Sequence, residues 1–166
     1  VFHTLRRRIA GLPESLRLEA QKILTLEEAI LERFRAIARM RITARRIRCH
    51  GDYHLGQVLY TGKDFVIIDF EGEPAKPLSE RRFKRSALRD VAGMLRSFQY
   101  AGYSALFAHQ ARDIVKPDDL DYFEQCVNLW VQWSSRVFLR AYLEAAKDGG
   151  FLPGTREEFQ ALLDIF

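Results

Sequence analysis

The chain has 166 residues, a hydrophobic fraction of 48% and a charged fraction of 29%, which is typical of one globular domain with its own core. No apolar run is long enough to span a membrane, and two cysteines far apart give no disulfide framework or zinc site, so we expect a cytoplasmic protein with free thiols. The net charge of +4 is compatible with anion binding, but basic runs such as 33–48 are typical of solvated helix faces, so we expect no nucleic-acid partner.

Helical signals fill the first third of the chain. Pro13 and Glu14 predict the start of a helix that runs to about Leu24, and Thr25 with Glu28 predicts a capping box for the next helix. Apolar residues then recur at helical spacing, and we expect them to form core. They are Leu26, Ile30, Phe34, Ile37, Ala38 and Ile42.

The hydrophobic period then changes to that of short strands. The candidate strands are Arg46–Cys49, Val58–Tyr60 and Phe65–Ile68. A turn centred on Gly62-Lys63 predicts that the last two form a β-hairpin, with Gln57 opposite Ile68. Gln57 and Asp69 should therefore meet at the open end of this hairpin.

Helices return after an irregular basic stretch that ends near Arg85. One helix is expected over about Ser86–Phe107 and a long one over about Asp119–Lys147, where Trp130 and Trp133 are expected to belong to the core.

A last helix should begin near Thr155, with Glu158 completing a capping box. The predicted fold class is therefore α+β, mostly α, with one small hairpin in the middle.

Acidic and amide side chains gather at the ends of the predicted strands. His50-Gly51-Asp52 follows one strand, Gln57 comes five residues after Asp52, and Asp69-Phe70-Glu71 ends the hairpin. Phosphoryl transfer from ATP needs a carboxylate at the attacking hydroxyl, plus an amide oxygen and a second carboxylate that hold Mg²⁺. Protein kinases place an Asn five residues after the catalytic Asp and use a later Asp-Phe-Gly. Each residue alone is compatible with a turn or a strand edge, but the joint spacing favours a phosphoryl-transfer site.

Three longer strings carry a resemblance to a known family. They are HGDYHLGQ (residues 50–57), DFEGEP (residues 69–74) and LRDVAGMLRSF (residues 88–98). Together they resemble the maltokinase family, which belongs to the aminoglycoside phosphotransferase-like group with a protein-kinase-like fold. The resemblance covers about residues 20 to 166 and is strongest from 45 to 105.

The resemblance implies a role for each matched residue. Asp52 would be the catalytic base, and Gln57 and Asp69 would hold Mg²⁺. Glu71 would support the metal shell or reach the sugar, and Asp90 would brace the catalytic loop by accepting backbone N–H bonds. The two histidines are expected to act without metal, because Mg²⁺ prefers oxygen: His50 as a brace of the loop and His54 as a substrate contact.

The implied reaction transfers the γ-phosphoryl group of ATP to maltose and gives maltose 1-phosphate. The chain carries no Gly-rich phosphate loop and no strand Lys for the α- and β-phosphates, which kinase-like folds keep in an N-terminal lobe. We therefore expect residues 1–166 to be a single C-terminal lobe, cut from a complete kinase and inactive alone. Some maltokinases are fused to a trehalose synthase, so the resemblance also implies a fused or associated trehalose synthase and a place in α-glucan metabolism.

Three alternatives remain open at this point. The acceptor could instead be an aminoglycoside or a choline-type cation, although the helices after residue 85 are not notably acidic. A non-catalytic helical module could use residues 33–48 on RNA or an acidic partner, which would leave the acid and amide residues unexplained. The chain could also be a regulatory lobe of a trehalose synthase that has lost catalysis.

Overall fold

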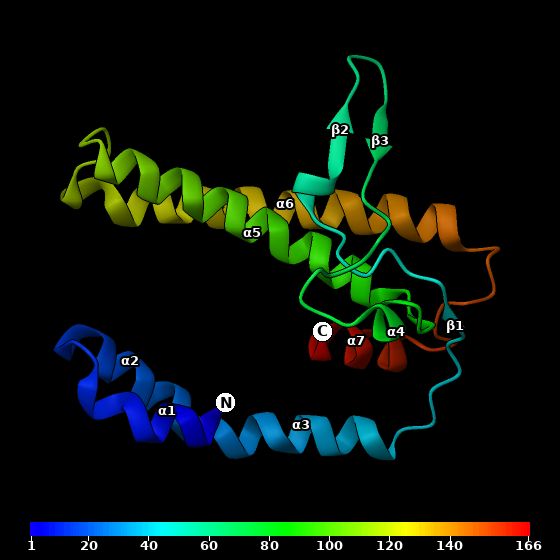
Figure 1. Cartoon of the computed structure of the whole chain (residues 1–166). Helices are drawn as coiled ribbons and strands as arrows, with labels where there is room; N and C mark the ends of the chain where they lie inside the picture. The colour runs from blue at the N-terminus through cyan, green and yellow to red at the C-terminus, as the bar shows by residue number, and fades with distance from the viewer. The chain divides into compact units, whose positions relative to one another are not determined.

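The structure is a computed structural model that describes all residues from 1 to 166, and it divides into two compact units (Figure 1). The first unit contains Val1–Arg41, and the second contains nearly all residues from Ile42 onward. No helix in either unit combines the length and the apolar character that crossing a membrane would require. The acid and amide residues singled out by the sequence all belong to the second unit.

The first unit consists of helices. It contains α1 (Phe2–Arg8), a 3₁₀ turn (Ile9–Gly11), α2 (Glu14–Thr25) and α3 (Glu27–Arg39). The predicted capping box at Thr25 is wrong, because Leu26 precedes α3 and no side chain caps that helix. The Thr25 hydroxyl instead donates to the Lys22 carbonyl oxygen at 2.7 Å, which is the backward bond that Ser and Thr make inside helices.

The predicted core of α3 is also wrong. No residue of this helix is buried, and Phe34 is 49% exposed. Helical spacing identifies the apolar face of an amphipathic helix, but it does not say that this face is covered. Ala20 of α2 is the one buried residue of the first unit.

The second unit begins with two short antiparallel ribbons. β2 (Val58–Tyr60) and β3 (Phe65–Ile67) form the predicted hairpin, with Val58 opposite Ile67. The N–H of Ile68 donates to the Gln57 carbonyl oxygen at 3.0 Å, so the predicted register is confirmed. The hairpin projects away from the helices of this unit (Figure 1).

The second ribbon was missed by the sequence reasoning. β1 (Arg46–Ile47) pairs with β4 (Arg85–Ser86), and α4 (Leu78–Arg81) lies in the stretch expected to be irregular. A two-residue strand and a four-residue helix are too short to show a hydrophobic period. β1 therefore pairs with a strand almost forty residues later. This pairing places the end of β1 beside the start of α5, the helix that follows β4.

Three helices complete the second unit. They are α5 (Leu88–Ala111), α6 (Leu120–Ala146), which follows a 3₁₀ turn at Pro117–Asp119, and α7 (Arg156–Ile165). α5 and α6 run side by side (Figure 1). Leu88, Val91 and Leu162 form a buried cluster between α5 and α7, and α6 packs against it through Phe138, Leu139 and Tyr142.

Trp130 and Trp133 are not core residues, contrary to the sequence prediction. Their exposed fractions are 46% and 66%, because α6 reaches the buried cluster only through its C-terminal half. The Trp130 ring meets Phe98 edge-on, with 6.2 Å between ring centroids, and also lies close to Gly102 of α5.

Half of the capping box at α7 is confirmed. The Thr155 hydroxyl accepts a hydrogen bond from the Glu158 N–H at 3.2 Å. The Glu158 carboxylate does not return to Thr155 but accepts from the N–H and hydroxyl of Thr43, at 2.9 and 2.8 Å. Glu158 therefore fastens α7 to the segment that leads into β1.

Candidate active site

The loop after β1 is fixed by the first turn of α5. The Asp90 carboxylate accepts hydrogen bonds from the N–H groups of His50 and Gly51, at 2.6 and 3.0 Å. Gly51 has φ = 90°, a conformation that glycine adopts without steric cost. Asp90 thus holds the backbone that leads directly to Asp52, almost forty residues earlier in the chain.

His50 connects the same loop to the end of the hairpin. Its ring is buried, Nε2 lies 2.7 Å from the Ile68 carbonyl oxygen, and Nδ1 accepts from the Asp52 N–H at 3.4 Å. Because Nδ1 is an acceptor here, the ring proton belongs on Nε2, which donates to Ile68. The Phe70 ring packs beside it at 4.9 Å between centroids. His50 therefore ties the segment of Asp52 to the segment of Asp69.

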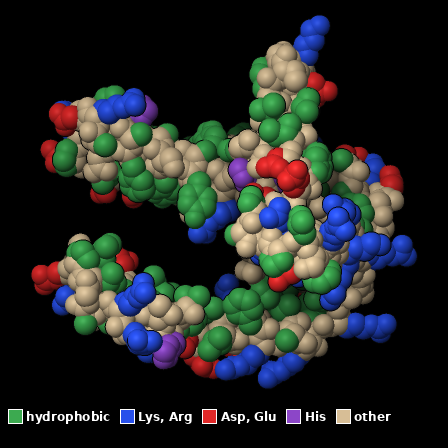
Figure 2. All heavy atoms as spheres, viewed as in Figure 1, with side chains coloured by type: hydrophobic (Ala, Val, Ile, Leu, Met, Phe, Trp, Pro, Cys, Tyr) green, Lys and Arg blue, Asp and Glu red, His purple; other side chains and the backbone are tan.

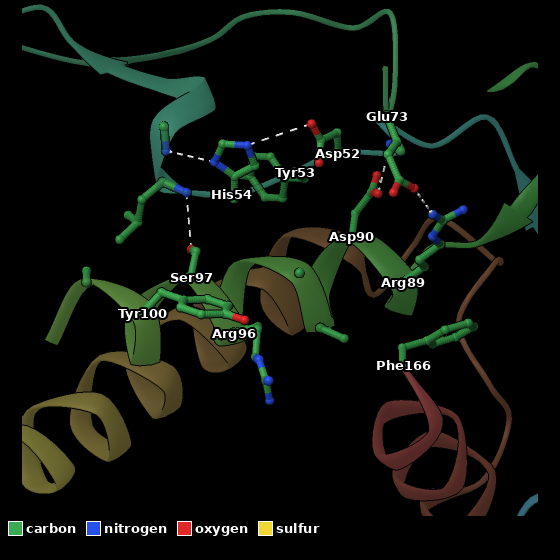
Figure 3. A pocket seen from close by; sticks show the side chains of 16 residues that line it. Asp52, Tyr53, His54, Glu73, Arg89, Asp90, Arg96, Ser97, Tyr100 and Phe166 are labelled. Carbon is green, nitrogen blue, oxygen red and sulfur yellow. Dashed lines mark hydrogen bonds and ion pairs between the residues drawn. The ribbon is translucent and has the colours of Figure 1, made fainter. Parts of the chain in front are cut away.

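Asp52 and His54 face one another at the edge of a pocket (Figure 3). The Asp52 carboxylate is one third exposed and lies 3.8 Å from His54 Nε2, beyond hydrogen-bond distance. His54 Nδ1 accepts from the Gly56 N–H at 3.1 Å, which leaves the Nε2 proton on the side of Asp52. Asp52 is thus an open carboxylate that an incoming hydroxyl can reach, as a general base requires.

The pocket beside Asp52 has a volume of about 560 Å³ and lies between the loop 51–56 and one face of α5. That face contributes Arg89, Gly93, Arg96, Ser97 and Tyr100, which recur at helical spacing. The Ser97 hydroxyl accepts from the Leu55 N–H at 3.1 Å and fixes the far end of the loop (Figure 3). A cavity of this size, with charged and polar side chains set among apolar ones, fits a small polar molecule.

Close approach of the loop to α5 depends on Gly93. A Cβ atom at this position would lie 2.7 Å from the Tyr53 carbonyl oxygen, closer than real Cβ contacts.

Burial, helped by the charge of Asp90, raises the pKa of the Tyr53 hydroxyl, so Tyr53 stays protonated at neutral pH. Burial likewise raises the pKa of the Cys49 thiol, which is not an activated nucleophile.

Gln57 and Asp69 meet at the open end of the hairpin. Gln57 Nε2 donates to the Asp69 carboxylate at 3.1 Å, and Asp69 has a positive φ of 59°. One carboxylate and one amide oxygen suit Mg²⁺, which keeps several waters and completes its shell with substrate phosphates rather than with a protein cage. The donor set therefore fits Mg²⁺, and no cluster of three or more His, Cys, Asp or Glu side chains competes as a metal site.

The two glutamates after Asp69 differ in position. Glu71 is exposed and does not line the pocket, whereas Glu73 does, and it pairs with Lys76 at 3.0 Å and with Arg89 at 3.4 Å. Sequence reasoning singled out Glu71 and missed the role of Glu73 and the polar face of α5. The helical recurrence of Arg89, Gly93, Arg96 and Tyr100, opposite the buried Leu88 and Val91, marks a polar face of α5 but does not indicate that this face meets the loop.

The chain is similar in sequence to known phosphotransferases and sugar kinases. A model of the phosphotransferase enzyme family matches residues 3–72. The chain is 32% identical over 96 residues to a glucosamine kinase of Streptacidiphilus jiangxiensis. The aligned segment covers 58% of this chain and 20% of that protein. It is 43% identical over 56 residues to a glucosamine kinase of Mycolicibacterium smegmatis (strain ATCC 700084 / mc(2)155), covering 34% of this chain and 14% of that protein.

Among solved structures, the chain is similar to a glucosamine kinase in complex with glucosamine, ADP and inorganic phosphate. The likeness has a TM-score of 0.69 at 25% identity and covers 98% of this chain. The chain therefore has a kinase-like fold. It spans 38% of the length of that structure and a smaller share of the curated relatives it matches.

Proposed function

We propose that this chain is the C-terminal lobe of a cytoplasmic sugar kinase, which transfers the γ-phosphoryl group of ATP to a sugar hydroxyl with Mg²⁺. One observation carries the proposal. The open carboxylate of Asp52 faces a pocket of sugar size, on a loop that His50 ties to the segment of Asp69. The similarity to phosphotransferases and glucosamine kinases supports the same reaction class.

The chemistry proposed for this chain is positioning and proton acceptance. Asp52 orients the acceptor hydroxyl and takes its proton as the oxygen attacks, while His54 donates a hydrogen bond to the bound sugar or to Asp52. Mg²⁺ held by Gln57 and Asp69 would offset the charge of the phosphates. Asp90 and His50 keep the loop in place, so that Asp52 does not have to be ordered when the sugar binds. The contacts to the rest of ATP would come from an N-terminal lobe, because this chain has no Gly-rich phosphate loop.

For the acceptor we rank glucosamine ahead of maltose. The relatives and the solved structure are glucosamine kinases. Maltose stands second, supported by the strings HGDYHLGQ and DFEGEP of the maltokinase resemblance. Association with a trehalose synthase depends on the same resemblance and goes with the maltose alternative.

The test follows ADP release by the complete protein from Mg·ATP, with glucosamine, maltose, glucose and an aminoglycoside as separate acceptors. We expect glucosamine-dependent release, and a loss of about 10²–10⁴-fold in kcat for Asp52→Asn, the range for removing a general base. Asp121→Asn, an exposed position of α6 outside the pocket, is the matched control and should retain full activity.

The other outcomes are equally informative. Release with maltose alone would keep the mechanism and replace the acceptor. A folded protein that releases ADP with none of the sugars would reject the kinase in favour of a binding or regulatory module. Full activity of Asp52→Asn would remove Asp52 from the mechanism.

A further inference from the structure

A second pocket of the same unit shares only Phe166 with the pocket beside Asp52 and collects positive charge. It has a volume of about 350 Å³ and lies where the β1–β4 ribbon meets α7. Four of its side chains are basic: Arg45, Arg46, Lys84 and Arg85. The apolar side chains of Ala44 and Leu162 also line it, and blue side chains gather over this part of the unit in Figure 2.

No acidic side chain balances these four residues. The pocket has no Asp or Glu among its lining residues, and none of the four cations forms an ion pair. Elsewhere in this unit cations do find partners, as Arg89 does with Glu73. Like charges gathered in one pocket repel one another, so a bound anion would stabilise this region.

Arg85 gives a second and independent indication. Its Nε atom is buried and has no hydrogen-bond acceptor, and it is the one buried side-chain nitrogen or oxygen without a partner in the structure. Its guanidinium lies over the Phe83 ring, 5.7 Å from the centroid. Arg85 also lines a much smaller neighbouring pocket with Glu73 and Glu80, but it pairs with neither. A buried donor left without an acceptor is costly, and Arg85 would gain an acceptor if its side chain moved to an oxyanion bound in the pocket.

We propose that this pocket binds a small phosphate-bearing molecule. An arginine guanidinium can donate two parallel N–H hydrogen bonds to two oxygens of one phosphate, and the Lys84 ammonium adds a further positive charge. The Ser86 oxygen already accepts from the Leu88 N–H at 3.3 Å, which leaves its hydroxyl hydrogen free to donate to the anion. The apolar side chains of Ala44 and Leu162 would contact the organic part of the ligand. The volume suits a small molecule rather than a polymer.

The test measures binding rather than turnover, so its result is separable from that of the kinase assay. The complete protein is titrated with inorganic phosphate, a hexose phosphate and the neutral hexose, by calorimetry and by ¹H–¹⁵N spectra of arginine side chains. Arg85→Lys identifies the Arg85 Nε–H signal and keeps the charge. Arg46→Gln and Arg85→Gln remove lining charges, and Arg82→Gln, which removes the same charge from a residue that does not line the pocket, is the matched control.

We expect the Arg85 Nε–H signal to shift on addition of hexose phosphate. The affinity of the protein for hexose phosphate should fall at least tenfold in Arg46→Gln and in Arg85→Gln, but not in Arg82→Gln. Arg46 is exposed, so Arg46→Gln keeps the test informative if Arg85→Gln does not fold. Equal affinity for inorganic phosphate would support the site and assign it to free phosphate. An unmoved Arg85 signal, equal weakening by Arg82→Gln, or binding of the neutral hexose with the same affinity would each overturn the proposal.

Discussion

Asp90 joins two parts of the chain that lie about forty residues apart in the sequence. Its carboxylate accepts two backbone N–H groups, from His50 and Gly51, and lies in the first turn of α5 where negative charge is favourable. Hydrogen bonds to a charged group are among the stronger side-chain contributions to stability. The position of Asp52 therefore depends on a residue that does not need to touch substrate.

We expect Asp90→Asn to lower the free energy of unfolding by on the order of 2 kcal/mol, because the amide can accept only one of the two bonds and turns a donor toward the other. Loss of loop order should also lower kcat in the sugar-kinase assay. Urea unfolding and turnover are measured side by side, with Asp121→Asn as the control. Unchanged stability and turnover would show that the loop orders without Asp90.

At the scale of elements, α5 and the loop after β1 come together through a glycine. A Cβ atom placed on Gly93 would lie 2.7 Å from the Tyr53 carbonyl oxygen, which leaves no room for a side chain because the clash is with backbone. Gly93→Ala should therefore push the loop from α5 at a cost of about 1–3 kcal/mol, and should reduce turnover through displacement of Asp52.

The control for this substitution is Gly11→Ala, because a Cβ at Gly11 meets nothing within 4 Å. Urea unfolding of both variants and the kinase assay decide the outcome. Turnover of Gly93→Ala equal to that of the unsubstituted protein would mean that the loop does not approach α5 this closely.

α7 is fastened to the segment before β1 by one carboxylate. Two hydrogen bonds lower the pKa of Glu158 below its ordinary value of 4.5: the larger effect comes from the Thr43 N–H and the next from the Thr43 hydroxyl. Burial opposes them and raises this pKa, and the Gly154 N–H lowers it by a smaller amount. A carboxyl group whose pKa is lower in the folded state stabilises the fold above its unfolded pKa. That contribution disappears as the pH falls from about 4.5 through the folded pKa.

We expect Glu158→Gln to be less stable than the unsubstituted protein at pH 7, and the difference to shrink as the pH falls below about 4.5. Urea unfolding at pH 7 and at successively lower pH values measures this. Glu157→Gln, which changes the exposed neighbour, should leave the pH profile unchanged. A constant difference between Glu158→Gln and the unsubstituted protein over this range would contradict the assignment.

For the whole molecule, the sequence predicts elements whose signals are local. The hairpin follows from the turn at Gly62-Lys63, and the long helices follow from their apolar stripes. β4 and the covering of apolar faces could not be predicted, because both depend on contacts between distant segments.

The same distinction applies to the candidate site. Asp52, Gln57 and Asp69 stand out through spacing along one segment of the chain. Glu73 and the α5 face with Arg96 and Tyr100 line the pocket only because α5 turns that face toward the loop, and a single sequence does not reveal which polar face of a helix meets a loop.

The buried cluster of the second unit is small, so its stability should depend strongly on few side chains. Leu88 has no exposed surface and packs with Val91 and Leu162, in the same turn of α5 that carries Asp90. Leu88→Ala should lower the free energy of unfolding by about 2–5 kcal/mol. The substitution would leave a cavity bounded by α5, α6 and α7, which cannot easily close around it. Leu129→Ala, at a position 68% exposed on α6, should change it by no more than about 0.5 kcal/mol. Similar small losses in both variants, measured by urea unfolding, would mean that the helices do not unfold as one unit around this cluster.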